Sequence, residues 1–191
     1  MGGGSAQSTR GSYIYTDFQS AFSTLMTVDI VVRKEPSYKV ISKSYVGPYS
    51  GGEMMKDEFY ALSKWAKKSG LKTGKWFFYE PDDPDTPEGS RRWEACIEVT
   101  GRPRGKLPKD IETRVLPPQL VASVVFDPDQ VSMRLVYHAI EGWLQWRTKF
   151  GEFEEAGPTR EVYLDDPWKN KKAWASADVQ VPVRKIRPSR L

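Results

Sequence analysis

The residues best suited to chemistry lie at positions 160–164, where a carboxylate and a phenol alternate with apolar side chains. Successive side chains of a strand point to opposite faces, so Glu161 and Tyr163 share one face and Val162 and Leu164 share the other. The apolar pair is expected to face the core. If the first face lines a cleft, Glu161 is a partly desolvated anion that requires a cation. If that face meets solvent, Glu161 is an ordinary polar edge residue.

A second carboxylate, Glu94, precedes a similar apolar stretch and is the expected counterpart of Glu161. Aromatic residues make up 13% of the chain and include seven tryptophans, more than a small core usually needs. A tryptophan at helical spacing more often belongs to the core, yet this number favours some rings lining a site. The candidate site therefore comprises two carboxylates and six aromatic side chains: Glu94, Glu161, Trp65, Trp76, Trp93, Tyr137, Trp143 and Tyr163. Aromatic rings around a carboxylate suit a flat, lipophilic cation.

Other chemistries lack the residues that they need. The single cysteine, Cys96, excludes an intramolecular disulfide and a cysteine-based metal site. The single histidine, His138, excludes a two-histidine metal site and is expected on the solvated face of a helix. No phosphate-binding glycine loop and no nucleophile elbow occur. We therefore predict no metal and no cofactor, and we favour binding over catalysis.

The charge and hydropathy of the chain restrict its partners. The formal net charge is +4, and the basic residues are scattered except in the tail, residues 185–191 with Arg184 just before it. Scattered charge predicts no specific nucleic-acid binding by this chain. No segment approaches the roughly 20 apolar residues that span a bilayer, so no membrane partner is expected. A lone cysteine fits a reducing compartment, and we predict a cytoplasmic protein. A protein partner is possible but nothing indicates one.

The patterned part of the chain begins near Val28. Residues 1–27 open with Met-Gly-Gly-Gly-Ser, which looks like a linker, and Met26 could equally be the native start. We interpret residues 1–27 as a flexible extension that can be deleted without loss of the fold.

Two halves of the remaining chain, residues 28–101 and 110–184, share one order of elements. Each is predicted to run strand, strand, break, helix, strand, strand. The predicted strands are residues 28–33, 38–46, 75–80 and 92–100 in the first half, and 111–115, 120–126, 160–164 and 178–183 in the second. The helices are expected from about residue 50 to 70 and from about 130 to 149. The sequence therefore predicts an α+β fold, duplicated β-β-α-β-β halves whose antiparallel sheets are related by a pseudo-twofold axis around a central cleft.

Several of these stretches together resemble the GyrI-like small-molecule-binding domain, also called the AraC effector-binding domain. They are Val28-Asp29-Ile30, Lys34-Glu35-Pro36, Gly47-Pro48-Tyr49, Trp93-Glu94-Ala95-Cys96-Ile97, Glu161-Val162-Tyr163-Leu164-Asp165-Asp166-Pro167 and Val179-Gln180-Val181-Pro182-Val183. The resemblance covers about residues 28–184, and it rests on the order and spacing of the motifs, since no single motif is highly specific.

The resemblance implies a cleft that binds varied lipophilic, often cationic compounds, with Glu161 as the pocket anion. Many family members are fused to a DNA-binding helix-turn-helix module and act as drug-responsive regulators. Residues 1–27 are too short for that module, so the resemblance is to the stand-alone type, which includes a gyrase inhibitor and relatives of hydrolases that open strained cyclopropane rings.

Three functions remain open at this point. The first is sensing or sequestration of lipophilic cations, multidrug-type binding that needs only the pocket. The second is hydrolysis of strained-ring toxic natural products, with Glu161 activating water and Tyr163 assisting by hydrogen bonding. The third is inhibition of a partner protein such as DNA gyrase, for which the acidic loop at residues 80–88 is the one candidate docking segment. The sequence favours the first.

Overall fold

The computed structural model describes residues 28–48, 53–82 and 86–187. The predicted N-terminal extension, residues 1–27, and the last four residues of the basic tail lie outside the described residues.

The order of helices and strands follows the prediction, with three short additions. The first half contains β1 (Val31–Glu35), β2 (Tyr38–Val46), α2 (Glu53–Lys68), β3 (Lys72–Tyr79), the 3-10 turn η1 (Glu88–Ser90) and β4 (Arg92–Thr100). The second contains β5 (Glu112–Leu116), β6 (Gln119–Val125), α3 (Met133–Lys149), β7 (Phe153–Glu155), β8 (Arg160–Tyr163), α4 (Lys171–Trp174) and β9 (Asp178–Lys185). The elements η1, β7 and α4 were not predicted.

Local signals set the ends of the two long helices. The Ser132 side chain accepts a hydrogen bond from the Leu135 backbone N–H at 3.3 Å and so caps the first turn of α3. Gly70 after α2 and Gly151 after α3 adopt positive φ angles of 78° and 69°, a backbone conformation that glycine adopts without strain. No helix among the described residues is long and apolar enough to cross a membrane.

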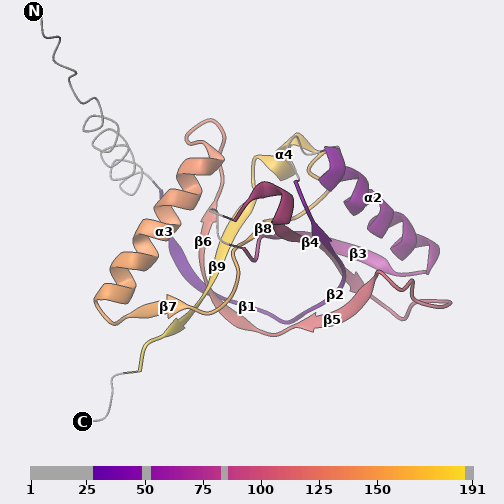
Figure 1. Cartoon of the computed structure of the whole chain (residues 1–191), viewed down its shortest axis with the longest axis horizontal. Helices are drawn as coiled ribbons and strands as arrows, with labels where there is room; N and C mark the ends of the chain where they lie inside the picture. The colour runs from indigo at the N-terminus through magenta and orange to yellow at the C-terminus, as the bar shows by residue number, and fades with distance from the viewer. Residues whose placement is uncertain (1–27, 49–52, 83–85, 188–191) are drawn as a thin grey trace, which may run out of the picture.

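All nine described strands belong to one antiparallel sheet, in the order β1-β6-β9-β8-β3-β4-β2-β5, with β7 paired to β9 (Figure 1). The α+β class and the antiparallel pairing are therefore confirmed. The strands of the two halves join at β3 and β8 into one continuous sheet, where separate sheets were expected. If each strand is replaced by its counterpart in the other half (β1 by β5, β2 by β6, β3 by β8 and β4 by β9), the same strand order is obtained, read from the opposite edge. A duplication would give this symmetry. Superposition of the two halves stays a prediction.

The first strand of each half pairs with the second strand of the other half. β1 pairs with β6, and β5 pairs with β2, so neither predicted strand pair at the start of a half forms a hairpin. The register is the same in both ladders, from Val31 opposite Ser123 to Ser42 opposite Glu112. Because proline lacks an N–H donor, the ladder is interrupted at Pro36 and at Pro117–Pro118, and the sheet curls there.

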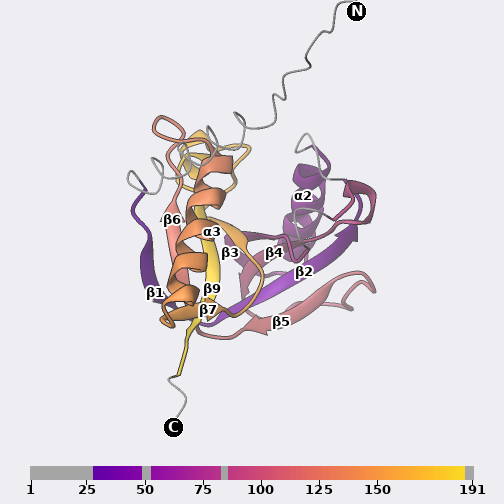
Figure 2. The same ribbon diagram turned by 60° about the vertical axis from the view of Figure 1, so that its left-hand side comes forward.

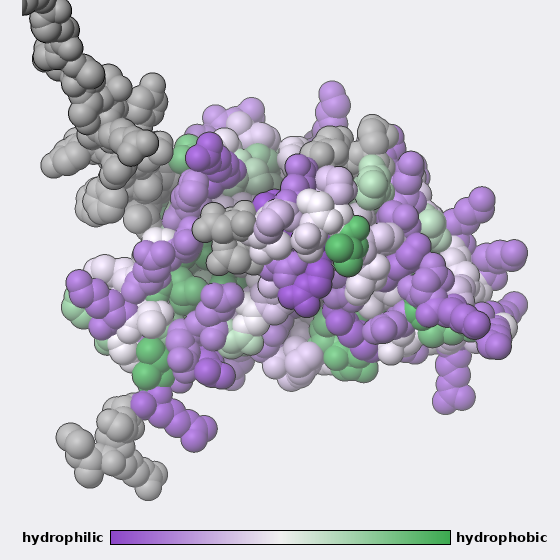
Figure 3. Space-filling model, in the orientation of Figure 1, coloured by the Kyte–Doolittle hydropathy of each residue, from purple (hydrophilic) through white to green (hydrophobic). Residues whose placement is uncertain are grey.

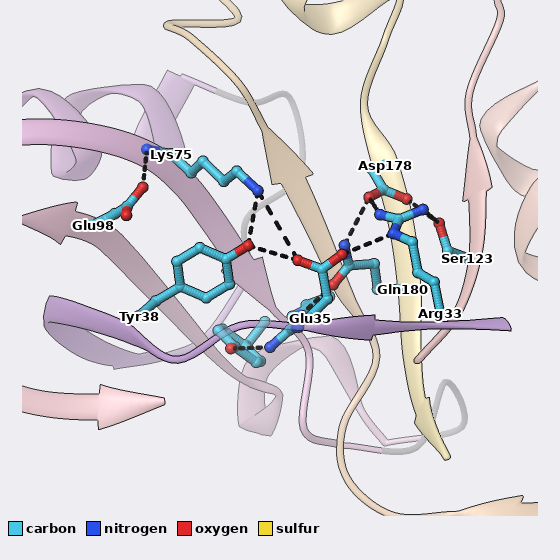
Figure 4. Close-up of polar contacts among 10 residues, drawn as sticks. Arg33, Glu35, Tyr38, Lys75, Glu98, Ser123, Asp178 and Gln180 are labelled. Carbon is cyan, nitrogen blue, oxygen red and sulfur yellow. Dashed lines mark hydrogen bonds and ion pairs between the residues drawn. The ribbon is translucent and has the colours of Figure 1, made fainter. Parts of the chain in front are cut away.

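A polar network crosses the inner face of the curl (Figure 4). Lys75 of β3 donates to the Tyr38 hydroxyl at 2.8 Å, and that hydroxyl donates to Glu35 at 2.6 Å. β3 is not adjacent to β1 or β2 in the sheet, so these side chains meet across the concave face. Arg33 donates to Glu35 at 2.8 Å and forms an ion pair with Asp178 of β9.

A small apolar cluster lies beside this network on the same inner face: Tyr38, Val40, Phe77, Tyr79, Cys96, Leu116 and Val162. Arg160 is buried among these groups and donates to the Gln180 side chain at 2.8 Å and to the Tyr79 hydroxyl at 3.0 Å. The buried charges of the inner face are thus matched by carboxylate, amide and hydroxyl partners, as burial requires.

The two long helices cover the outer face of the sheet and enclose the larger core (Figure 2). α2 packs on β2, β3 and β4, and α3 packs on β6, β7 and β9. Between them lie the central strands β8 and β3. The surface seen in Figure 3 is mostly hydrophilic, with apolar side chains scattered over it.

The network makes the stability depend on Glu35. Burial by itself raises the pKa of Glu35, but hydrogen bonds from Tyr38 and Arg33 and the charges of Arg33 and Lys75 outweigh it, so the pKa is lowered. A lowered folded-state pKa stabilises the fold above the ordinary value of 4.5, and that stabilisation disappears as pH falls through the folded-state value. We expect Glu35→Gln to lower the free energy of unfolding by about 1–3 kcal/mol at pH 7 and to flatten its loss in acid.

Urea denaturation at pH 7 and pH 4 measures both effects. The matched control is Glu112→Gln on the exposed side of β5, which should change stability little. Equal stabilities of the two variants at pH 7 would show that the network does not hold the curl.

Candidate functional site

A pocket of about 630 Å³ opens between α3 and the outer face of the sheet. We call it the α3 pocket. α3 contributes Arg134, Tyr137, His138, Ile140, Glu141 and Leu144, and β9 contributes Val179 and Val181. β7 contributes Glu155, and the segments after β3 and before β8 contribute Glu80, Pro81, Asp82, Pro158 and Thr159. Its volume lies within the range of small-molecule sites, roughly 300–1,000 Å³.

Helix and strand periodicity place these groups. Tyr137, Ile140, Glu141 and Leu144 follow the i, i+3, i+4, i+7 spacing of one helix face. Val179 and Val181 alternate on β9, so both point outward from the sheet toward α3. The apolar part of the pocket therefore lies deep, between the helix and the sheet.

Glu161 lies directly beneath this pocket. It pairs across the sheet with Val179, which lines the pocket, and its side chain is buried, with 9% of the residue surface exposed. The Tyr137 hydroxyl donates to one carboxylate oxygen at 2.8 Å, and the Tyr163 hydroxyl donates to the other. Within the described part of the chain, no lysine, arginine or histidine forms an ion pair with Glu161.

The electrostatics of Glu161 follow from this arrangement. Burial raises the pKa of Glu161, and the hydrogen bonds from Tyr163 and Tyr137 oppose the rise without cancelling it. Two neutral phenols therefore stabilise the carboxylate where a cation would do so more strongly.

A second carboxylate, Glu80, forms part of the pocket wall. Burial, and after it the charge of Glu161, raise the pKa of Glu80 to about 7 against the opposing charge of Arg91. At neutral pH the Glu80 side chain is thus divided between its charged and neutral forms. The sequence prediction placed Glu80 at the end of the strand 75–80 and at the start of the acidic loop 80–88, and did not name it as a site residue. Strand alternation from Trp76 and Phe78 places it on the outer face.

The rim of the pocket is charged and exposed. Arg134 donates to the His138 ring at 3.3 Å, and His138 lies 3.9 Å from a carboxylate oxygen of Glu141. His138 was expected on the solvated face of the helix; it is exposed, and it also lines the pocket.

The structure brings together three of the eight predicted site residues: Glu161, Tyr163 and Tyr137. Tyr163 lies opposite Trp76 in the sheet and stacks on Trp174 with ring centroids 6.1 Å apart. Trp143 lies on α3 but outside the pocket, stacked on Phe153 at 5.9 Å.

The remaining tryptophans belong to the packing under α2. Trp93 is buried and stacks on Tyr45 at 4.2 Å, and Trp76 stacks on Phe59 at 5.2 Å. Trp65 is partly buried against the same core. Of these three, Trp76 also borders a second pocket beneath α2.

Two sequence expectations need correction. Glu94 is not the counterpart of Glu161, because it lies beside Tyr79 on the inner face of the sheet, where Arg114 donates to it at 2.5 Å. Leu164 does not face the core; β8 ends at Tyr163, and Leu164 is 63% exposed. Val162 is buried as expected, but in the inner cluster.

Comparison with known families accounts for this arrangement. A sequence profile of the GyrI-like small molecule binding domain matches residues 28–184. The chain belongs to the GyrI-like family. No match was found among curated proteins. This GyrI-like domain is therefore a small-molecule-binding domain, and its α3 pocket is the candidate site.

Solved structures agree with the family at the level of the fold. The crystal structure of the EcmrR C-terminal domain has a TM-score of 0.62 and 21% identity, covering 83% of this chain and 99% of that one. EcmrR in a DNA complex has a TM-score of 0.63 and 18% identity, covering 91% and 69%. A hydrolase encoded by lin2189 from Listeria innocua has a TM-score of 0.51 and 12% identity, covering 87% and 98%.

The raised pKa of Glu80 predicts a pH-dependent cost to stability. A folded-state pKa above the ordinary 4.5 contributes stability below that value, and the contribution is lost as pH rises through about 7. We expect Glu80→Gln to match the wild type near pH 4.5 and to be more stable at pH 8, by about 1 kcal/mol after allowance for partial exposure.

Thermal and urea unfolding from pH 4.5 to 8 measure this difference. Glu155→Gln, an exposed carboxylate of the same pocket, is the control and should show no such pH trend. A constant difference between wild type and Glu80→Gln across the range would contradict the assignment.

Proposed function

We propose that this GyrI-like domain binds lipophilic, cationic aromatic small molecules in the α3 pocket, as a sensor or sequestering protein. The observation that carries the proposal is Glu161, a buried carboxylate beneath the pocket that has phenol partners but no cation among the described residues. The family match supports small-molecule binding, and the charge of the pocket supports the ligand class.

The pocket offers each part of such a ligand a matching surface. Ile140, Leu144 and the two β9 valines, Val179 and Val181, supply apolar area for a flat ring system. The Tyr137 ring supplies an aromatic face for a cation. A cation that approaches Glu161 would replace a neutral hydrogen-bond partner with a charge, an exchange worth most where water is excluded.

Glu80 adds a second negative group and couples binding to pH. A bound cation stabilises the charged form of Glu80 and lowers its pKa, so ligand binding is coupled to proton release from Glu80. Because the pKa of Glu80 is about 7, cation affinity should be higher at pH 8 than at pH 6. The location that we propose for this role is the cytoplasm, which suits a single buried thiol.

A second candidate function, hydrolysis of strained-ring compounds, is favoured by the same pair of carboxylates. Glu161 would take a proton from a water molecule whose oxygen bonds to a ring carbon. Protonated Glu80 would give its proton to the ring atom that leaves when the strained bond breaks. Two neighbouring carboxyl groups with raised pKa values suit such acid–base work. Consumption of a cyclopropane electrophile by the wild type, and not by Glu161→Gln, would replace simple binding with this function.

Glu161→Gln separates charge from shape at the proposed site. We expect the variant to bind a flat cationic dye more weakly by about 1–3 kcal/mol, because a charge-assisted contact is lost. An uncharged analogue of the dye should bind both proteins about equally. Titration followed by tryptophan fluorescence at pH 8 measures both affinities, and a repeat at pH 6 should show weaker cation binding by the wild type.

The control for long-range charge is Glu155→Gln, which removes an exposed carboxylate from the same pocket. Its effect on cation affinity should be small and should vanish in high salt. Equal cation affinity of wild type and Glu161→Gln would mean that Glu161 is not the pocket anion.

A further inference from the structure

A second pocket, of about 610 Å³, lies between α2, the start of β3 and the turn that follows β8. We call it the α2 pocket. Its lining comprises Tyr60, Ser63, Lys64 and Lys67 of α2; Thr73, Gly74 and Trp76 of β3; and Leu164, Asp165, Asp166 and Lys169 after β8. It shares no lining residue with the α3 pocket.

Two aromatic rings form one wall of this pocket. The Tyr60 and Trp76 rings meet edge to face at 86°, with centroids 6.2 Å apart. Trp168 lies behind them, 6.1 Å from each ring. A ring inserted here would meet aromatic edges and faces of a fixed cluster, which favours flat aromatic ligands.

The charge of the α2 pocket is opposite to that of the α3 pocket. Lys64 and Lys67 lie one turn apart on α2, both exposed, and neither forms an ion pair with any residue that the structure describes. Lys169 lies over the Tyr60 ring at 4.9 Å and pairs with Asp166 at 3.2 Å. Long hydrophilic side chains cover the α2 end of the face in Figure 3.

The two carboxylates of the pocket are already engaged in the turn after β8. Asp166 accepts hydrogen bonds from the backbone N–H groups of Trp168 and Lys169 and from the Tyr60 hydroxyl at 3.3 Å. Asp165 accepts from the Asp166 backbone at 2.8 Å and from the Asn170 side chain at 3.3 Å. These carboxylates therefore fold the turn, and the pocket is left with more donors than acceptors.

Two further side chains in the wall carry hydrogen-bond donors. Ser63 and Trp76 line the pocket with 7% and 6% of their surfaces exposed. A serine hydroxyl and an indole N–H both donate hydrogen bonds. An anionic ligand would accept from such donors where they face the pocket.

We propose that the α2 pocket binds small aromatic anions, such as aromatic carboxylates or sulfonates. The ring would pack against Trp76 and Tyr60, and the anionic group would lie between Lys64 and Lys67. The two helices of the domain would then carry sites of opposite charge preference, and the α2 site does not depend on the proposed function of the α3 pocket.

Calorimetric titration with three naphthalene probes tests the proposal: 2-naphthoate, the neutral 2-naphthylmethanol and the cationic 2-naphthylmethylammonium. The wild type should bind 2-naphthoate. Lys64→Gln and Lys67→Gln should each weaken it by about three- to tenfold, with a steeper loss in the double variant. Lys68→Gln, an exposed lysine of the same helix outside the pocket, is the matched control and should leave the affinity unchanged.

Glu161→Gln separates this site from the α3 pocket and should leave 2-naphthoate affinity unchanged. Binding of 2-naphthylmethanol as tight as that of 2-naphthoate would overturn the proposal, as would equal losses from Lys68→Gln and Lys67→Gln. Absence of 2-naphthoate binding at millimolar concentration would overturn it as well. All three lysines are exposed, so their substitution is expected to leave the fold intact.

Discussion

The longest segments of the sheet, β1–β2 and β5–β6, keep one antiparallel register on both sides of their proline breaks. Through this pairing the first strand of each half belongs to the ladder of the other half. Neither half therefore forms its part of the sheet without the other. It also fixes the curl, because side chains of β1 and β2 reach those of β3 and β9 across the inner face. The outer face is thereby left for α2 and α3, and β8 comes to lie at the centre of the sheet.

Buried charge is treated differently on the two faces of the sheet. On the inner face, Arg33 pairs with Glu35 and Asp178, and Arg114 pairs with Glu94. On the outer face, Glu161 has two tyrosine hydroxyls instead. An ion pair compensates the charge of a buried carboxylate and so serves the stability of the fold. A carboxylate with a raised pKa beneath a pocket lacks such compensation, and a cationic ligand can supply it. The contrast supports our proposal that Glu161 is the pocket anion.

Sequence patterns were sufficient for the order of elements and for the shared face of Glu161 and Tyr163, because both follow from local periodicity. They failed where the answer depends on which strands become neighbours. Glu94 was matched to Glu161 by its motif, but β4 and β8 present these motifs on opposite faces of the sheet. Periodicity also does not separate core tryptophans from site tryptophans, since Trp93 points outward like Glu161 yet is buried in the core under α2. Glu80 was predicted as the last residue of the strand at 75–80, but it was considered only as part of the acidic loop that follows and so was not proposed as a site residue.

We propose that a bound cation replaces phenol hydrogen bonds at Glu161. A crystal structure of the protein with a flat aromatic cation, grown at pH 8, tests it most directly. We expect the cation in the α3 pocket, within about 6 Å of the Tyr137 ring and in contact with the Glu161 carboxylate, with the Tyr137–Glu161 hydrogen bond broken or lengthened. A cation bound elsewhere, with both tyrosine hydroxyls still on Glu161, would contradict it.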